Sequence, residues 1–313
     1  MRDSSAVAKI IQSLERRVET GDYYEAQQTY KARYARLVSS HKYDDAMELL
    51  QSGACAQLKH GQVTCGTELG VLLIETFRKA EVPFGPTPVD RIIAIYKEYP
   101  RVDISKIKST ADSGNISEDC IAARTRVEEC TTFLKAAIKW SIESGGPERG
   151  APVLHHMLAN YIWTQSPIPE FGKASLYYIR GNCPEAFSQA VVDCMDKCYS
   201  EEVDLVVARA ILLYLTLGYL KDANMFLEKV KETSPEKLPD SPLLHFIKFL
   251  LKTLERDALP LFQMLRQSYK PSIDRDPTFD EYLDEIAEQF YNVRQTSGIQ
   301  GMLGDIMKMF GDV

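Results

Sequence analysis

Apolar residues spaced three or four positions apart are the feature of this 313-residue chain that most restricts its fold. Ile10, Leu14 and Val18 recur every four residues, and the segments 23–37 and 279–293 keep the same spacing. Such a set places one apolar stripe along a helix. Strict alternation of apolar and polar residues, which is typical of strands, is scarce. The pattern therefore predicts an all-α protein.

Polar stretches rich in Gly and Pro separate the helical runs. They lie at 83–88, 109–117, 145–152, 165–169 and 234–242. Breaks at this spacing bound helices of about 12–25 residues, as in stacked helical hairpins. We expect roughly a dozen or more helices.

A weak internal repeat also favours stacking. A large side chain is followed three positions later by alanine, where a helix should begin. The four pairs are Tyr23/Ala26, Tyr43/Ala46, Phe171/Ala174 and Leu220/Ala223. Alanine at that position lets neighbouring helices approach closely. The interpretation is a tetratricopeptide-like α-solenoid with at most a minor β-hairpin in its C-terminal half, although the usual repeat length is not kept and chance remains an alternative.

Composition restricts the partners and the compartment. The net charge of -7 argues against a nucleic-acid-binding protein. The most apolar run, 203–220, contains Asp204 and Arg209, so we expect no membrane span. There is no signal-peptide pattern at the start of the sequence and the cysteine count of seven is odd, which indicates reduced thiols in the cytosol.

Charge differs between the two ends of the sequence. Residues 1–42 hold eight basic and five acidic side chains, whereas residues 273–313 hold three basic and nine acidic ones. Solvated helix faces explain either end alone. Opposite signs at the two ends of an elongated molecule suggest two different partners.

The sequence contains no motif for catalysis or cofactor binding. Phosphate-binding loops, zinc-protease motifs and nucleophile elbows are missing. Cys194 and Cys198 stand four residues apart and could face one ion, but a closed zinc site needs four ligands. We expect two buried structural thiols there, no metal, no cofactor and no enzyme activity. A helical hydrolase with a cryptic Cys/His site is left as an alternative.

The last segment, 295–313, differs from the rest of the chain. It is rich in Gly and Met, and Met302 and Leu303 belong to one apolar face of a short helix. Met-rich apolar faces are adaptable binding surfaces. Binding a partner and folding back on the last hairpin are both open.

Longer stretches of sequence resemble one protein family. The segment 14–58 contains GDYYEA, a helix rich in tyrosine and arginine, and then ELLQSGA. TELGVLLIE at 67–75, LLHFIKFLL at 243–251 and YKPSIDRDPTFDEYLDEIAEQFYNV at 269–293 continue the likeness. Together these resemble the Golgi to ER traffic protein 4 family, the scaffold subunit of the pathway that delivers tail-anchored membrane proteins.

The resemblance implies a non-enzymatic cytosolic adaptor with two partners. Residues 1–150 would dock the targeting ATPase. Residues 151–294 would bind a ubiquitin-like-domain protein and, in animal relatives, a BAG-domain scaffold, with 295–313 as an apolar tail. The alternative within the same fold class is a generic tetratricopeptide-like subunit of a proteasome-lid or signalosome-type complex.

The residues that match the family motifs fall into two sets. On the ATPase side they are Tyr23, Tyr24, Lys31, Arg36 and Glu68. On the C-terminal side they are Tyr269, Pro271, Asp276, Tyr282, Met302 and Leu303. The segment 231–242 is short where some relatives insert a β-hairpin that contacts the ubiquitin-like partner, so whether a strand forms there is open.

Overall fold

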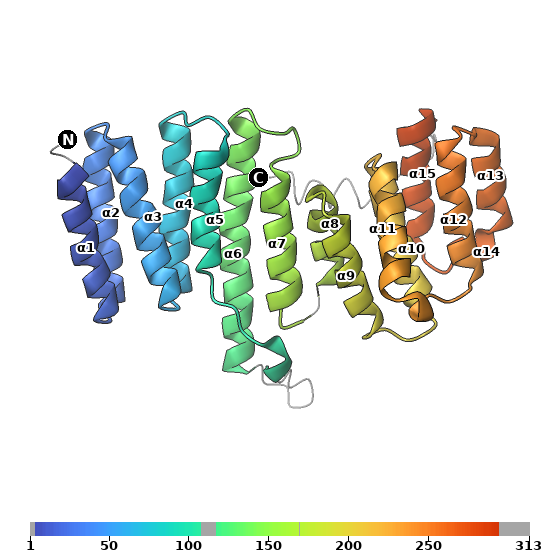
Figure 1. The fold of residues 1–313 in the computed structure, drawn as a ribbon, viewed down its shortest axis with the longest axis horizontal. Helices are drawn as coiled ribbons and strands as arrows, with labels where there is room; N and C mark the ends of the chain where they lie inside the picture. The colour runs from blue at the N-terminus through green and yellow to red at the C-terminus, as the bar shows by residue number, and fades with distance from the viewer. Residues whose placement is uncertain (1–3, 108–116, 169, 294–313) are drawn as a thin grey trace. The chain divides into compact units, whose positions relative to one another are not determined.

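The computed structural model describes residues 4–107, 117–168 and 170–293. Over these residues the chain forms fifteen α-helices, two short 3-10 helices and no strand. The helices make two compact units, one up to Glu170 and one from Phe171 onward (Figure 1). The all-α prediction is confirmed, and the helix number agrees with the spacing of the sequence breaks.

The first unit contains α1 (Ser4–Glu19), α2 (Tyr23–Ser39), α3 (Tyr43–Lys59), α4 (Val63–Lys79), α5 (Pro86–Lys97), η1 (Ile104–Lys106), α6 (Glu118–Glu143) and α7 (Pro152–Gln165). The second contains α8 (Phe171–Arg180), α9 (Pro184–Met195), α10 (Val203–Thr216), α11 (Leu220–Thr233), η2 (Pro235–Lys237), α12 (Pro242–Glu255), α13 (Leu259–Ser268), α14 (Lys270–Ile273) and α15 (Thr278–Tyr291).

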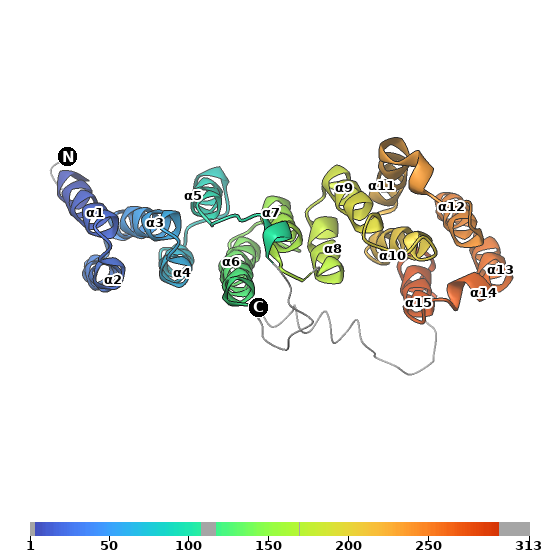
Figure 2. The same ribbon diagram turned by 90° about the horizontal axis from the view of Figure 1, so that it is seen from below.

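The helices of the first unit form two rows. Figure 2 shows α2, α4 and α6 in one row and α1, α3, α5 and α7 in the other. Helices α1 to α5 each pack on their neighbours in this part of the sequence, and within the rows α1 packs on α3, α2 on α4, α3 on α5 and α4 on α6. One face of this unit is therefore built from α2, α4 and α6 alone.

A strict spacing of twenty residues governs the first four helices. The turn residues Gly21, His41, Gly61 and Glu81 all adopt positive φ. At each turn the backbone N–H of the next residue donates to a carbonyl five residues earlier, for example Asp22 to Arg17 at 3.0 Å. This is the Schellman helix ending, which satisfies the last carbonyls of a helix. Consequently α2, α3 and α4 are each 17 residues long.

The alanines of the repeat lie where helices approach each other. Ala26, Ala46, Ala174 and Ala223 are all fully buried. The spacing of twenty also brings a third small residue, Gly66, to the same position in α4. A Cβ on Gly66 would lie 2.5 Å from Leu58 Cγ, which is shorter than any normal contact. The physical reason given for the repeat, close approach of backbones, thus fits this part of the molecule.

The core of the second unit is α10. It packs against α8, α9, α11, α12 and α15, and eleven of its fourteen residues are buried. Its two charged residues are paired with consecutive residues before α15: Asp204 accepts from Arg275 at 2.7 Å, and Arg209 donates to Asp276. Among the described helices, none has the length and apolarity that a membrane crossing requires.

The segment 231–242 contains no strand. It finishes α11, forms the 3-10 turn η2 and leads into α12. The two compact units are divided between Glu170 and Phe171, whereas we expected two halves divided after residue 150. The functional division into halves stays a prediction. The tail 295–313, with Met302 and Leu303, lies outside the described residues.

Candidate functional site

A polar cluster joins α2 to α4 on the face built from the even-numbered helices. The carboxylate oxygen Oε2 of Glu68 accepts from Lys31 Nζ and, at 2.6 Å, from Gln27 Nε2. The side chains of Lys31 and Glu68 are 34% and 47% exposed, so the pair is open to a partner. Tyr24 lies two turns before Lys31 on the same stripe of α2 and is 70% exposed.

The other two expected residues on this side point elsewhere. The carbonyl of Tyr23 accepts from Gln57 Nε2 at 2.9 Å, and its ring lies 6.1 Å from the ring of His60, so Tyr23 faces α3. Arg36 is five positions after Lys31, which places it about 140° around the helix. The fold therefore brings Tyr24, Lys31 and Glu68 together and separates Tyr23 and Arg36 from them. We call Tyr24, Lys31 and Glu68 the α2–α4 surface.

This surface continues onto α6. Burial raises the pKa of the Cys65 thiol on α4. The nearby Glu68 and Glu129 carboxylates raise this pKa further, whereas Lys31 lowers it. Next to Cys65 a hollow of about 340 Å³ lies between the start of α4 and the first half of α6. Arg126 lines it together with Pro100 and Thr125. Sequence reasoning missed these residues because they come together only through the packing of α4 on α6.

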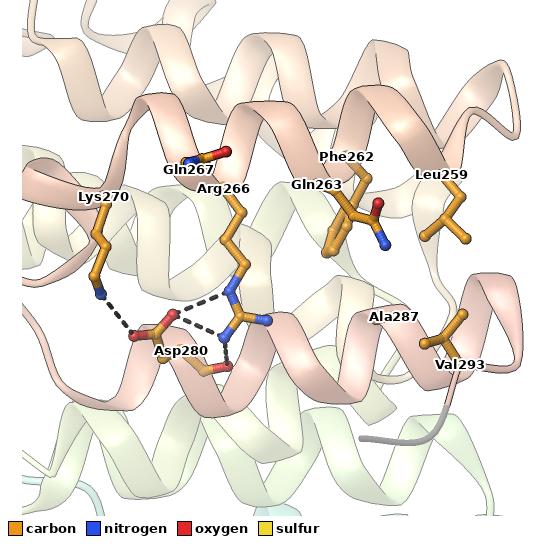
Figure 3. Close-up of a pocket in the computed structure, with 9 residues that line it drawn as sticks. All are labelled: Leu259, Phe262, Gln263, Arg266, Gln267, Lys270, Asp280, Ala287 and Val293. Atoms are coloured by element: carbon orange, nitrogen blue, oxygen red, sulfur yellow. Dashed lines mark hydrogen bonds and ion pairs between the residues drawn. The ribbon is translucent and has the colours of Figure 1, made fainter. Parts of the chain in front are cut away.

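A groove of about 280 Å³ runs between α13 and α15 in the second unit. Figure 3 shows its two ends, which differ in chemistry. One end is apolar and is lined by Leu259, Phe262, Ala287 and Val293. The other end carries Arg266, Lys270 and Asp280.

Ion pairs hold the polar end of this groove. Arg266 donates from Nη2 to Asp280 Oδ1 at 2.9 Å and from Nη1 to Asp284. Lys270 lies 3.8 Å from the same Asp280 and donates to Asp274 at 2.8 Å. These bonds join α13 to α15 across the groove floor. Because the pairs are 14 and 18 residues apart, no helical spacing could have identified them from sequence.

The expected C-terminal residues divide between two faces of the second unit. The ring of Tyr269 packs on Phe246 at 5.7 Å, and Pro271 is exposed on α14, so both border the helices of the groove. Asp276 is 7% exposed, and Tyr282 is half-buried on the α10 side of α15, where burial raises its pKa.

Asp276 is engaged inside the unit. Its carboxylate accepts from Arg209 and, at 3.0 Å, from the backbone N–H of Thr278, which starts α15. Burial alone would raise the pKa of Asp276, but these hydrogen bonds outweigh burial and hold the pKa below its usual range. Asp276 can therefore contribute to a partner site only indirectly, by holding the start of α15 in place. Met302 and Leu303 belong to the tail outside the described residues.

The thiols Cys194 and Cys198 correct another expectation. Both are half-buried rather than buried, and α9 ends at Met195, so Cys198 lies beyond the helix. Within the described ranges there is no group of three or more His, Cys, Asp or Glu side chains placed to hold a metal ion.

Comparison with known proteins decides the family. The family model described as Golgi to ER traffic protein 4 matches residues 40–310. The chain belongs to the Golgi to ER traffic protein 4 family. Membership supports a role in ER-related traffic as part of an ER-targeting complex, and together with the all-helical fold it points to a non-enzymatic protein. The match includes Glu68 and the groove, whereas α2 precedes it.

Full-length relatives extend the likeness over α1 and α2. Protein GET4 of Arabidopsis thaliana is 45% identical over 99% of this chain and 98% of its own length. The Golgi to ER traffic protein 4 homolog of Homo sapiens is 31% identical over 98% of this chain and 87% of its own length. The crystal structure of C. therm. Get4 has a TM-score of 0.75 at 23% identity and covers 98% of this chain and 96% of that one, which shows a common fold.

Proposed function

We propose that this Golgi to ER traffic protein 4 family member is a cytosolic, non-enzymatic scaffold for post-translational insertion of tail-anchored proteins into the ER membrane. It holds the targeting ATPase on its first unit and a ubiquitin-like-domain partner, with or without a BAG-domain scaffold, on its second. Holding both raises their effective concentration near each other. The full-length family likeness favours this role over a proteasome-lid or signalosome subunit.

The observation that carries the ATPase side is the α2–α4 surface. An exposed aromatic residue, Tyr24, lies two turns from a charge pair that is open to solvent, on the same stripe of α2. Tyrosine beside charged groups is typical of interface anchors. A docked partner would contact both the Tyr24 ring and the Lys31–Glu68 ion pair. The charged pair would act mainly on the association rate.

Three variants test whether this pair docks the ATPase or only joins two helices. Lys31→Glu breaks the pair and places two carboxylates together. The exchange Lys31→Glu with Glu68→Lys restores the pair inside the protein but reverses the charges that a partner meets. We expect both to slow ATPase association by about tenfold at low salt, measured by surface plasmon resonance. Lys106→Glu, at an 82% exposed side chain on η1, is the control and should bind normally.

The exchange variant separates the two roles. If it binds the ATPase as the parent protein does, the Lys31–Glu68 pair is only a tie between α2 and α4 and the docking assignment is wrong. Circular dichroism melting of each variant shows whether the fold is kept.

The observation that carries the C-terminal side is the groove between α13 and α15. It offers an apolar half to a side chain and a charged half to a polar group, which suits a partner helix or loop. Gln263→Trp should fill the groove and weaken the ubiquitin-like partner at least about tenfold. Met264→Trp, at the next position on α13 but outside the groove lining, is the matched control. Equal binding by both variants would rule out the groove as the docking place.

A further inference from the structure

Two thiols meet at the end of α9. Cys194 lies in the last turn of this helix, Cys198 lies in the connection that follows, and their Sγ atoms are 3.9 Å apart. The backbone turns tightly between them: the N–H of Lys197 donates to the Cys194 carbonyl at 2.9 Å, and that of Cys198 to the Met195 carbonyl at 3.2 Å. A disulfide needs the sulfurs about 2.05 Å apart, so the two Sγ atoms have to approach by about 2 Å, through side-chain rotation and adjustment of the turn.

Solvent reaches this pair. Both cysteines are half-buried, so part of each side chain is open to solvent; Asp196 and Lys197 between them are exposed, and Tyr199 just beyond is 81% exposed. Cys120 and Cys130, in contrast, are buried within α6. Solvent access and a second thiol within reach are two features of cysteines that form a disulfide on oxidation.

We propose that Cys194 and Cys198 form a modification site at which a peroxide converts the two thiols into an intramolecular disulfide. The site is separate from the α2–α4 surface and from the groove between α13 and α15, and it does not depend on the proposed scaffold function.

The chemistry proceeds in two balanced steps. The Cys198 thiolate attacks one peroxide oxygen, the O–O bond breaks, and hydroxide leaves, which gives Cys198 sulfenic acid. The sulfur of Cys194 then attacks the Cys198 sulfur and forms the S–S bond, while the sulfenic hydroxyl leaves as water with the Cys194 proton. Two thiols are oxidised, one peroxide is reduced, and two waters form when hydrogen peroxide is the oxidant.

The surroundings of Cys194 bear on which thiol reacts with the peroxide. Burial, and next the neighbouring Cys198, raise the pKa of Cys194 to about 12. A thiol held protonated is a poor nucleophile toward peroxide but can still resolve a sulfenic acid beside it. We therefore write Cys198 as the first thiol oxidised; exchanging the roles of the two thiols gives the same disulfide.

Oxidation would fix the connection from α9 to α10. This connection is already tied by an ion pair between Asp196 and Lys237 of η2 at 2.6 Å, and by the Glu201 carbonyl, which accepts from Arg275 at 2.7 Å. A covalent bond at its start restricts the local opening that proteases need. We expect native cleavage after Tyr199 by chymotrypsin to slow several-fold in the oxidised protein.

Lys197 makes the disulfide directly detectable. The reduced, folded full-length protein is treated with hydrogen peroxide, alkylated in denaturant and digested with trypsin without reduction. Cleavage after Lys197 separates peptide 181–197 from peptide 198–209. A disulfide between Cys194 and Cys198 therefore keeps these two peptides linked. Cys183 shares the first peptide, and the Cys183→Ser variant removes this ambiguity; that residue is about 16 Å from Cys194 along α9.

The expected result is a linked 181–197/198–209 pair as the dominant oxidised product of both the parent protein and Cys183→Ser. The same treatment of the urea-unfolded chain should scatter the linkages among the cysteines. If Cys198 in the folded protein is instead recovered as free thiol, as sulfinic acid or joined to another cysteine, the proposal is wrong.

A second probe gives its main result on the parent protein. Phenylarsine oxide bridges two neighbouring thiols, and one equivalent should protect both Cys194 and Cys198 of the folded protein from alkylation. In Cys194→Ser or Cys198→Ser the remaining thiol should be alkylated freely. Alkylation of both thiols in the arsenical-treated parent protein would overturn the assignment.

Discussion

Single residues in the helix turns have effects that the sequence pattern alone would not reveal. Gly21 and Gly61 adopt the left-handed conformation at little steric cost, whereas His41 and Glu81 occupy the equivalent turns with a Cβ. For a residue other than glycine the left-handed region costs roughly 1–2 kcal/mol. The turn is kept because the helices on both sides of it are packed.

The turns therefore predict opposite effects for two substitutions. Glu81→Gly should stabilise the protein by about 0.5–1 kcal/mol, because it removes the strain at φ +49° and Glu81 is exposed. Gly21→Ala should destabilise it by about 1 kcal/mol, although no atom lies within 4 Å of the new Cβ. Urea unfolding followed by circular dichroism measures both. A stabilising Gly21→Ala would contradict the account.

Glu285 gives the protein a pH dependence of its own. Burial, and next the Glu281 and Glu288 carboxylates, raise its pKa from 4.5 to about 7. The folded state thus favours the protonated form. The stability that this provides is complete below the unfolded pKa near 4.5 and is lost as the pH rises through 7.

The variant Glu285→Gln should remove this loss. At or below pH 4.5 its unfolding free energy should equal that of the parent protein. At about pH 8 it should be more stable by about 1 kcal/mol, a value well below the full linkage energy because the half-exposed carboxylate is screened by solvent. Urea unfolding at both pH values measures the difference. A constant difference at both would exclude titration of Glu285 as the cause.

Whole helices depend on small residues at their crossings. Helix propensity alone predicts that replacing a helical glycine by alanine stabilises a helix by up to about 1 kcal/mol. In α4 the crossing with α3 prevents this, because the Cβ of residue 66 would meet both Leu58 and the backbone carbonyl of Ala54 at 3.1 Å.

Two glycine substitutions separate propensity from packing. Gly66→Ala should destabilise the protein by about 1–3 kcal/mol through overpacking. Gly172→Ala in α8, where nothing lies within 4 Å of the new Cβ, should be neutral or slightly stabilising. Thermal and urea unfolding of the two variants give the comparison. Equal effects would show that the α3–α4 crossing relaxes to accept a methyl group.

At the scale of the whole molecule, the division into two compact units separates the two candidate surfaces. The α2–α4 surface belongs wholly to the first unit and the groove between α13 and α15 to the second. Each surface is held by ion pairs within its own unit. A substitution on one surface should therefore leave the other surface in place.

Under the proposed function, the two partners should bind independently. The Lys31→Glu and Glu68→Lys exchange should leave the affinity for the ubiquitin-like partner within about twofold of the parent value, and Gln263→Trp should do the same for the ATPase. Isothermal titration of each partner, with and without the other, measures this. A large coupling in either direction would mean that the surfaces communicate.

The helical fold was largely readable from the sequence. Apolar periodicity predicted the helices, Gly- and Pro-rich stretches marked several of their ends, and the aromatic–alanine repeat predicted close crossings that the buried Ala26 and Ala46 bear out. These features are local, because they depend on residues within about one helical turn of each other. The resemblance of the longer motifs to a known family supplied the expected function.

Tertiary structure decided which of the motif residues meet. Of the five residues expected on the ATPase side, only Tyr24, Lys31 and Glu68 share a surface, because helix rotation turns Arg36 away. Asp276 proved to be a buried partner of Arg209, 67 residues earlier, and the two thiols at the end of α9 proved half-buried and close. Sequence spacing fixes the face of a single helix, but contacts between helices depend on how those faces pack, and that is set by side-chain volumes distributed over the whole unit.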